Sequence, residues 1–262
     1  MKRYKLMKKL IALILVFVFV LCFCGCTVSV HTDTYPDAEK YSVGDAEFAA
    51  ETIKSISIDY VGDVDITLSD TDKVTVTETT KSDVSDDYRV HTYVDDGTLL
   101  IKYCKSGLKL RTDLNTWQRD YDKNLKIELP KDLVLKMFDM DLAAGNAIVE
   151  IPDCETVDCD IAAGELGLKL TKCSDFDLDM AAGECKLVFD SLPKTARIDM
   201  AAGDVDVAMP KDASLTLTLD KVAGGFNSDI KYTKDGEKYV FGDGDNAMEI
   251  DCVAGDVNIM GK

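Results

Sequence analysis

The chain of 262 residues carries 48 aspartates and glutamates against 30 lysines and arginines, a formal net charge of −18. A protein this acidic repels the phosphates of nucleic acids and anionic lipid headgroups, so we expect neither as a partner. The length is sufficient for one hydrophobic core.

The first residues are typical of an export signal. Five basic side chains within residues 2–9 precede an unbroken apolar run from Leu10 to Leu21. Such a run suits a signal peptide and is short of the roughly twenty residues that a membrane-spanning helix needs. The ending Phe-Cys-Gly-Cys at 23–26 resembles a bacterial lipobox, with Phe23 in place of the usual leucine and Cys26 as the cysteine that is diacylated. An uncleaved membrane anchor is the alternative, and either places the domain outside the cytoplasm.

The sequence therefore divides into three parts. Residues 1–25 are predicted to be a lipoprotein-type signal peptide, 26–50 the lipidated N-terminus with a flexible tether, and 51–262 the folded domain. Removal of the signal takes away five basic and no acidic side chains, so the mature chain carries a charge of −23. A lipid-anchored domain this acidic would be repelled from the surface of an anionic membrane.

The segment before the regular repeats is less uniform. Residues 88–94 and 98–103 flank the turn Asp95–Gly97 and are predicted to form a hairpin or two adjacent rungs. Residues 104–123 form a long polar and basic loop. Its Trp117 and Tyr121 would stack a sugar ring of a ligand, or Trp117 would pin the loop against the domain.

An aspartate followed after one residue by Ala-Ala-Gly recurs along the chain. The glycines Gly145, Gly164, Gly183, Gly203 and Gly224 are 19, 19, 20 and 21 residues apart. The copies that end at Gly224 and Gly255 are weaker, and a shortened copy ends at Gly62. A fixed period near twenty residues predicts stacked repeats, none of which buries its apolar face alone.

Apolar residues alternate with polar ones on both sides of each glycine. Before Gly183 they are Leu178 and Met180, and after it Cys185, Leu187 and Phe189. Period two predicts strands. We therefore expect an all-β, single-stranded β-helix or solenoid with rungs of about 19–21 residues. The left-handed hexapeptide pattern is missing, which favours right-handed winding.

The C-terminal end departs from this period. The spacing from Gly224 to Gly255 is 31 residues, and the insertion reads as a hairpin that turns at Asp235-Gly236. The last rung, Asp251–Met260, has no capping helix after it and could pair with a second copy of the chain. Polar residues on that rung argue instead for a protected edge.

The aspartates of the repeats are the candidate metal ligands. By alternation, those four and six residues before each glycine point outward and form two ladders of carboxylates about 5 Å apart. The ladders could bind calcium, which takes several oxygen ligands in flexible geometry, or they could form a solvated acidic face. The candidate ligands are Asp139, Asp141, Asp158, Asp160, Asp177 and Asp179.

Six cysteines remain after the signal and Cys26, and their spacing fits no zinc site. Cys159, Cys185 and Cys252 fall on inward positions and are predicted to be buried apolar residues. Cys154 and Cys173 follow their own glycines by nine residues and should stack on adjacent rungs. A disulfide between them is a candidate in an oxidising compartment.

The chain resembles the bacterial putative-adhesin domain family over about residues 45–260. The matching residues are Leu125–Pro130, the Ala-Ala-Gly rungs, and Tyr239–Gly244 leading into Ile250–Ile259. The resemblance implies a β-solenoid that is often anchored by its signal, with unassigned biochemistry, and it implies no functional residues.

Three functions are compatible with these features. The first is an extracytoplasmic, membrane-anchored binding or scaffold module without catalytic activity, acting on a cell-envelope protein or glycan. The second is a calcium-dependent polysaccharide-active enzyme in which Arg197 or Lys221 supplies the base. The third is an envelope-stress sensor that works through a partner protein. The catalytic motifs of hydrolases, phosphate loops and zinc proteases do not occur, which favours the first.

Overall fold

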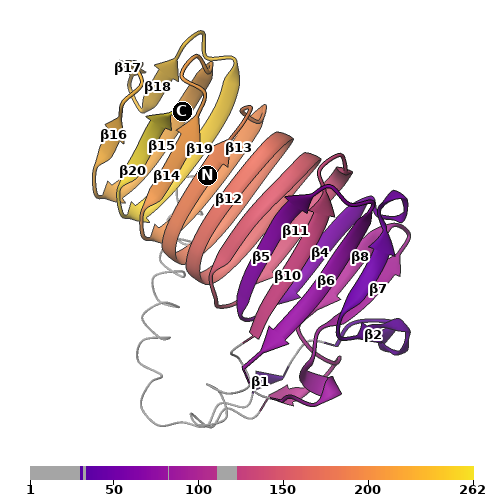
Figure 1. Ribbon diagram of the computed structural model, residues 1–262. Helices are drawn as coiled ribbons and strands as arrows, with labels where there is room; N and C mark the ends of the chain where they lie inside the picture. The colour runs from indigo at the N-terminus through magenta and orange to yellow at the C-terminus, as the bar shows by residue number, and fades with distance from the viewer. Residues whose placement is uncertain (1–29, 32–33, 82, 111–122) are drawn as a thin grey trace, which may run out of the picture.

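The computed structural model describes residues 30–31, 34–81, 83–110 and 123–262. They form an elongated stack of strands with three short 3-10 helices, η1 (Ala38–Lys40), η2 (Ala50–Thr52) and η3 (Asp86–Tyr88) (Figure 1). No α-helix occurs in the described part of the chain. The all-β solenoid predicted from the sequence is confirmed.

The strands form two facing sheets that the chain joins at each corner. The first sheet leads into the glycine corners and contains, in spatial order, β2 (Ser42–Val43), β7 (His91–Asp95), β8 (Thr98–Lys102), β4 (Ser55–Tyr60), β11 (Val134–Leu142), passes of β12 (Ala147–Phe189), β13 (Thr195–Ala202), β19 (Asn246–Ala254), β15 (Leu215–Ala223), β18 (Lys238–Phe241) and β17 (Thr233–Asp235). The second sheet leaves the corners and contains β3 (Ala46–Ala49), β6 (Lys73–Thr80), β10 (Lys123–Pro130), β5 (Asp63–Ser69), further passes of β12, β14 (Val205–Met209), β20 (Val257–Gly261) and β16 (Phe226–Ser228). A separate pair joins β1 (Val30–His31) and β9 (Lys109–Leu110).

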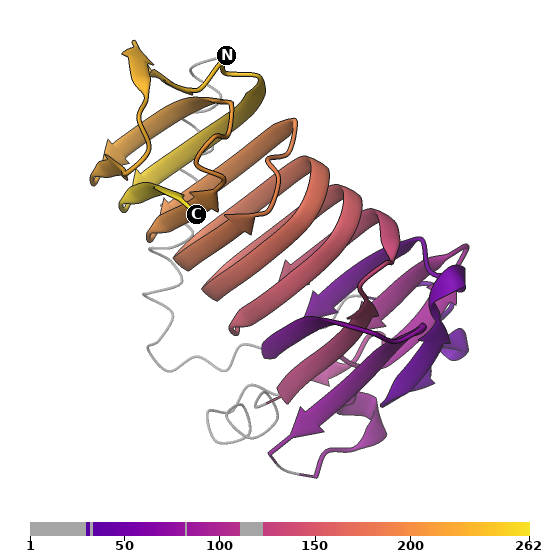
Figure 2. The same ribbon diagram turned by 45° about the horizontal axis from the view of Figure 1, so that its top comes forward.

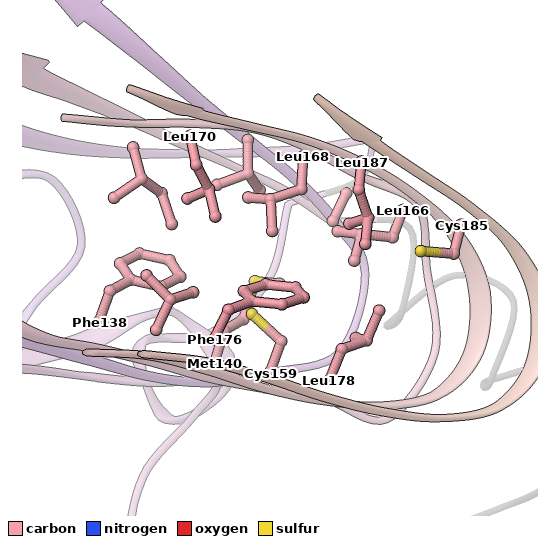
Figure 3. Packing of buried hydrophobic residues seen from close by; sticks show 14 of the residues in the cluster. Phe138, Met140, Cys159, Leu166, Leu168, Leu170, Phe176, Leu178, Cys185 and Leu187 are labelled. Atoms are coloured by element: carbon pink, nitrogen blue, oxygen red, sulfur yellow. The ribbon is translucent and has the colours of Figure 1, made fainter. Parts of the chain in front are cut away.

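The core lies between the two sheets and follows the alternation of the sequence. Phe138, Cys159 and Leu178 project from the first sheet towards Leu168 and Leu187 of the second (Figure 3). All are buried, as are the other inward side chains of β12, such as Val149, Leu170 and Phe189. Since burial of apolar surface is the main driving force of folding, each rung gains stability only by stacking on its neighbours.

Glycine is required at the corners for two separate reasons. Gly183 has a φ of +135°, which L side chains rarely adopt. A Cβ at Gly183 would also lie 1.7 Å from the carbonyl oxygen of Gly164, the glycine of the neighbouring rung. The corner glycines thus stack backbone on backbone, and in spatial order this glycine ladder is Gly62, Gly145, Gly164, Gly183, Gly203, Gly255 and Gly224.

The rungs do not stack in the order of the sequence at the C-terminal end. The last rung, β19–β20, lies between β13–β14 on one side and β15–β16 on the other (Figure 2). Both edges of this rung are therefore paired within the chain, so it is not the terminal rung of the stack that its place in the sequence indicated. The end of the first sheet is instead covered by the antiparallel hairpin β17–β18, which pairs with β15 and turns at Asp235–Gly236 as predicted.

The N-terminal end is also out of sequence order. Rung β4–β5 lies between β11–β12 and an outer rung made of β8 and β10 (Figure 1). Antiparallel strands then close both sheets: β7 pairs with β8, and β6 pairs with β10. The pairing of β7 with β8 confirms the hairpin that turns at Asp95–Gly97.

The second half of the predicted tether is folded onto this end. β2 pairs with β7 and β3 pairs with β6, so residues 42–49 extend the two sheets. The Tyr35 hydroxyl donates to the carbonyl oxygen of Cys104 at 2.9 Å, and the Tyr35 ring lies 4.6 Å from that of Tyr41. Residues 26–50 as a whole are therefore not a tether, because the aromatic rings and alternating residues of the later part pack on the solenoid.

Candidate functional site: the acidic face

Each strand of the first sheet enters its corner in the same register, which aligns the outward aspartates. Parallel strands lie about 4.8 Å apart, so aligned side chains repeat at that spacing. The column four residues before each glycine is, in spatial order, Asp59, Asp141, Asp160, Asp179, Asp199, Asp251 and Asp220. The column two residues earlier is Ser57, Asp139, Asp158, Asp177, Arg197, Glu249 and Thr218. We call the two columns together the acidic face.

The acidic face has few counter-charges among the described residues. Lys102 continues the first column at its N-terminal end, with its Nζ 3.7 Å from Asp59 Oδ2. Arg197 interrupts the second column and forms an ion pair with Asp199. The Ser57 hydroxyl donates to Asp139 Oδ2 at 2.8 Å. The middle rungs, which carry Asp158 and Asp160, therefore present carboxylates to solvent.

Partial burial and crowding raise the pKa values of several of these carboxylates. Partial burial raises the pKa of Asp141 to about 6, and repulsion from Asp139, Asp160 and Asp59 adds to that rise. Burial, followed by neighbouring aspartates, also raises the pKa of Asp158. Burial raises the pKa of Asp177 although Arg197 opposes the shift. The face thus stores electrostatic repulsion that a proton or a cationic partner would relieve.

We expect the melting temperature to rise as the pH falls from 7.5 to 5.5. A carboxyl whose pKa is higher in the folded than in the unfolded state stabilises the fold when it is protonated, and this contribution is lost as the pH rises through the folded pKa. Allowing for solvent screening, a rise of about 2–4 °C corresponds to roughly 1 kcal/mol in a domain of this size. The Asp141→Asn variant should melt higher at pH 7.5 and depend less on pH, whereas Asp65→Asn on the second sheet should follow the native profile. Equal pH profiles for all three proteins in thermal melts would contradict this.

The six candidate metal ligands lie on the acidic face as predicted, but they do not converge. Asp139, Asp158 and Asp177 follow one column, and Asp141, Asp160 and Asp179 the other. No three side chains of His, Cys, Asp or Glu among the described residues form a group that could hold a metal ion. Parallel side chains at strand spacing point side by side, whereas a calcium cage needs oxygens that converge on one point. Calcium binding stays a prediction.

The two basic residues considered for catalysis are engaged in the structure. Burial lowers the pKa of Arg197, but Asp199 and Asp177 outweigh that effect and raise it above the ordinary value. Lys221 donates to the carbonyl oxygen of Gly224. A guanidinium held in its charged form is a poor base, so the geometry gives the enzyme hypothesis no support.

The cysteines of the described residues are free and buried. The burial of Cys159, Cys185 and Cys252 agrees with the inward positions predicted for them. Cys154 donates to the carbonyl oxygen of Thr156 at 3.0 Å, and Cys173 to that of Asp175 at 2.9 Å. The candidate disulfide between Cys154 and Cys173 is not formed in this structure, where both cysteines carry thiols. Burial raises the pKa of these thiols to about 12 and about 11, which disfavours the thiolate that disulfide formation needs.

Three predicted site residues lie outside the described residues. These are Cys26, the predicted lipidation site, and Trp117 and Tyr121, the predicted ligand-stacking residues. In the part of the chain that the structure describes, no helix is long and apolar enough to cross a membrane.

A buried ion pair near the N-terminal end was missed by sequence reasoning. Lys123 of β10 and Glu78 of β6 are 2.6 Å apart, and both side chains are 0% exposed. Lys123 also donates to the carbonyl oxygens of Tyr88 and Tyr103, at 2.6 and 2.8 Å, and lies 3.9 Å from the ring of Tyr103. Glu78 accepts from the Tyr60 hydroxyl at 2.8 Å and the Val90 amide at 2.9 Å. The signal was available, because both charges share the inward parity of apolar neighbours such as Val76 and Leu125.

Two open grooves lie away from the acidic face, one at each end of the solenoid. The first, of about 550 Å³, lies over β3, β6 and β10 and is lined by residues that include Glu47, Thr75 and Lys126. The second, of about 330 Å³, is lined by residues that include Lys211 and Ile230. Neither groove contains a histidine or a cysteine, and both are shallow relative to the buried pockets that small-molecule ligands usually occupy.

The stacked glycine corners lie within a region that matches a known family model. Residues 131–260 match the family described as Toastrack, DUF4097. This region is a Toastrack domain. The match confirms the resemblance noted from the Ala-Ala-Gly rungs and from Tyr239–Gly244. The Toastrack domain spans β11 to β20, and the rungs made of β4, β5, β8 and β10 continue its stack towards the N-terminus.

Several solved structures are similar to this chain at low sequence identity. A putative cell adhesion protein from Clostridium sporogenes is 17% identical, with 85% of this chain and 100% of that one covered and a TM-score of 0.43. A putative adhesin from Parabacteroides merdae is 13% identical, with 87% and 99% covered and a TM-score of 0.35. One from Bacteroides fragilis is 10% identical, with 83% and 97% covered and a TM-score of 0.32. No curated protein matches the chain.

Proposed function

We propose that this protein is a non-catalytic binding and scaffold module, similar to an adhesin, that a lipid on Cys26 holds outside the cytoplasm. Its binding surface is the acidic face, and its ligand is a cationic segment of a cell-envelope protein. The export signal, the lipobox and the mature charge of −23 support the location. The names of the similar solved structures agree with an adhesive role.

The observation that carries this proposal is the register of the acidic face. Aligned carboxylates run without a break from Asp59 to Asp220 along the first column, while Arg197 is the one basic side chain set within the two columns. Charged surfaces of one sign attract partners of the opposite sign and speed their association. An extended chain with lysine on alternate residues, laid along the columns, would present an ammonium group about every 7 Å to carboxylates spaced about 4.8 Å apart, so each lysine would lie near one or two of them.

Raised pKa values on the same face favour this ligand over a neutral one. Burial raises the pKa of Asp141 and Asp158, and repulsion between neighbouring aspartates adds to the rise; a bound ammonium group would relieve that repulsion. Binding should therefore release any protons held by these carboxylates, and affinity should fall as the pH drops from 7.5 to 5. It should also fall as salt is added, because exposed charges are screened over about 10 Å at 0.1 M ionic strength.

We expect a lysine-rich peptide of about twenty residues to bind the mature domain, and calorimetry at two salt concentrations measures this. The triple variant Asp158→Asn, Asp160→Asn, Asp179→Asn should lose about tenfold in affinity, which is about 1.4 kcal/mol. A matched control, Glu150→Gln, Glu165→Gln, Glu184→Gln, removes the same charge from the second sheet and should change affinity by less than about twofold. Equal losses in both variants would mean that net charge alone attracts the peptide, and the acidic face would not be the site.

A calcium titration of the same proteins tests the remaining prediction for the six aspartates. Saturable heat with a rise in melting temperature, lost in the acidic-face variant only, would favour calcium as the ligand of the face. It would also reopen the polysaccharide-active enzyme as a candidate.

A further inference from the structure

The C-terminal rung stands apart because it is the last part of the chain yet occupies an internal place in the stack. β19 forms parallel pairs with β13 and β15, and β20 forms parallel pairs with β14 and β16. In Figure 2 the yellow C-terminal strand lies between two orange rungs. The chain therefore leaves a gap of one rung after β14 and fills it only with its final residues.

The rung on the far side of the gap is attached through β19 and β20. The pairings of the described strands join β15 to β19 and β18, and join β16 to β20. Two rungs of a stack are about 9.6 Å apart, twice the strand spacing, which is too far for hydrogen bonds between β13 and β15. Without β19–β20, the unit from β15 to β18 would have no strand pairing with the rest of the solenoid.

The gap is fitted to this rung along its whole length. The inward side chains Met248, Ile250, Val257 and Ile259 are buried, and three of them are 0% exposed. The corner fits closely, since a Cβ on Gly255 would lie 1.7 Å from the carbonyl oxygen of Gly203.

Side chains outside the core continue the fit on both sides of the gap. Asn258 Nδ2 donates to Asp206 Oδ1 at 2.7 Å, and Asn227 Nδ2 donates to Asn258 Oδ1 at 3.0 Å. The Asp256 amide donates to Asp204 Oδ1 at 2.8 Å. These bonds cross both interfaces of the last rung, so its position is recognised by specific residues of the two neighbouring rungs.

The N-terminal end is stacked out of sequence order in a similar way. β4–β5 comes first in the chain, β8 and β10 then add to one side of it, and β11 with β12 adds to the other. There too, β8 and β10 lie between β4–β5 and the antiparallel strands β7 and β6, all of which precede them in the chain. At the C-terminal end the later rung must enter between two earlier ones.

We propose that the space between β13–β14 and β15–β16 is a strand-acceptor site and that the chain's own C-terminal segment, residues 243–262, is its ligand. The segment enters last, and its entry docks the β15–β18 unit. Until the final residues are available, the edges of β13, β14 and β15 remain open, and open edges pair readily with other strands. The stack from β13 to β18 would thus be complete only once residues 243–262 have entered it.

The test uses the full chain with a protease recognition sequence inserted between the exposed residues Gly242 and Asp243. After folding, cleavage should leave the fragment 243–262 bound at one copy per molecule in native mass spectrometry. Moderate urea should release the fragment before the rest unfolds. Hydrogen exchange should then rise in β13–β16 while β11 and β12 stay protected.

A labelled synthetic peptide of residues 243–262 should re-enter the emptied site on dilution from urea. The same peptide with Gly255→Val should bind at least about 100-fold more weakly, because its side chain meets the Gly203 carbonyl. The proposal is overturned if the fragment leaves only when the whole chain unfolds, or if β15 and β16 stay protected after it has left. Equal binding of the two peptides would also overturn it.

Discussion

The Gly183→Ala variant should fail to fold, or should lose about 4 kcal/mol or more of stability, a loss that few single substitutions reach. A non-glycine residue at a φ of +135° is strained by about 1–3 kcal/mol. The new Cβ would also meet the Gly164 carbonyl oxygen at 1.7 Å, and that atom is backbone on which the neighbouring rung depends. Relief would require the two rungs to separate, which would break the strand hydrogen bonds beside the corner.

Gly167→Ala is the matched control, because Gly167 lies in the same strand and has open space around it. An added Cβ there meets only the Ala147 carbonyl oxygen, at 3.9 Å, an ordinary contact. Alanine at a compatible position restricts the unfolded chain, so this variant should be neutral or stabilised by about 0.4–1 kcal/mol. Urea unfolding of both variants measures the difference. Similar stability for the two would show that the corner can relax, contrary to a rigid glycine ladder.

The Lys123→Met variant should lose about 3–5 kcal/mol, the usual cost of leaving one charge of a buried pair without its partner. Glu78 would keep its hydrogen bonds from Tyr60 and Val90, and Arg89 Nε lies 3.8 Å from its Oε2. These contacts satisfy oxygens of the carboxylate but replace neither the lysine charge nor its bonds to the carbonyls of Tyr88 and Tyr103. Because the pair connects β6 to β10, the N-terminal end should loosen first.

Two further variants distinguish the effect of a buried unpaired charge on stability from the effect of losing any lysine of this strand. Lys126→Met, in the same strand, removes an exposed partner of Glu128 and should cost less than about 1 kcal/mol. The double variant Lys123→Met, Glu78→Leu should be more stable than Lys123→Met alone, because it no longer buries a carboxylate that has lost its lysine partner. Chemical unfolding gives the three values. A double variant that is less stable than the single one would mean that the packing of these two side chains, rather than the pairing of their charges, stabilises the N-terminal end of the solenoid.

The architecture could be predicted from sequence because one residue pattern serves two physical demands at once. Alternation places Leu178 and Met180 inward. At position 183 the backbone of the neighbouring rung lies so close that no residue with a Cβ fits, and only glycine is possible. The outward aspartates follow from the same parity, so their alignment in two columns could be predicted, whereas the places of Ser57, Arg197 and Thr218 in the second column were not.

Rung order could not be predicted in the same way, because the rungs are nearly equivalent. Ile250–Gly255 presents the same corner as Ile198–Gly203, and either would stack on any other rung of the series. The deciding feature is the hairpin β17–β18, which covers the outer edge of β15 and leaves β19 only the inner side. Its presence was visible in the longer spacing after Gly224, but the side on which it packs was not.

The interlocked ends limit where the molecule can gain or lose length during evolution. A duplicated rung added after Met260 would find no free edge beside β20, since that strand already has β14 and β16 as neighbours. A duplication within β12, where each rung follows the last in simple order, would add a corner, two strands and their aspartates without disturbing either end. Relatives of different copy number should therefore differ in the middle of the stack, and their acidic faces should lengthen by whole rungs.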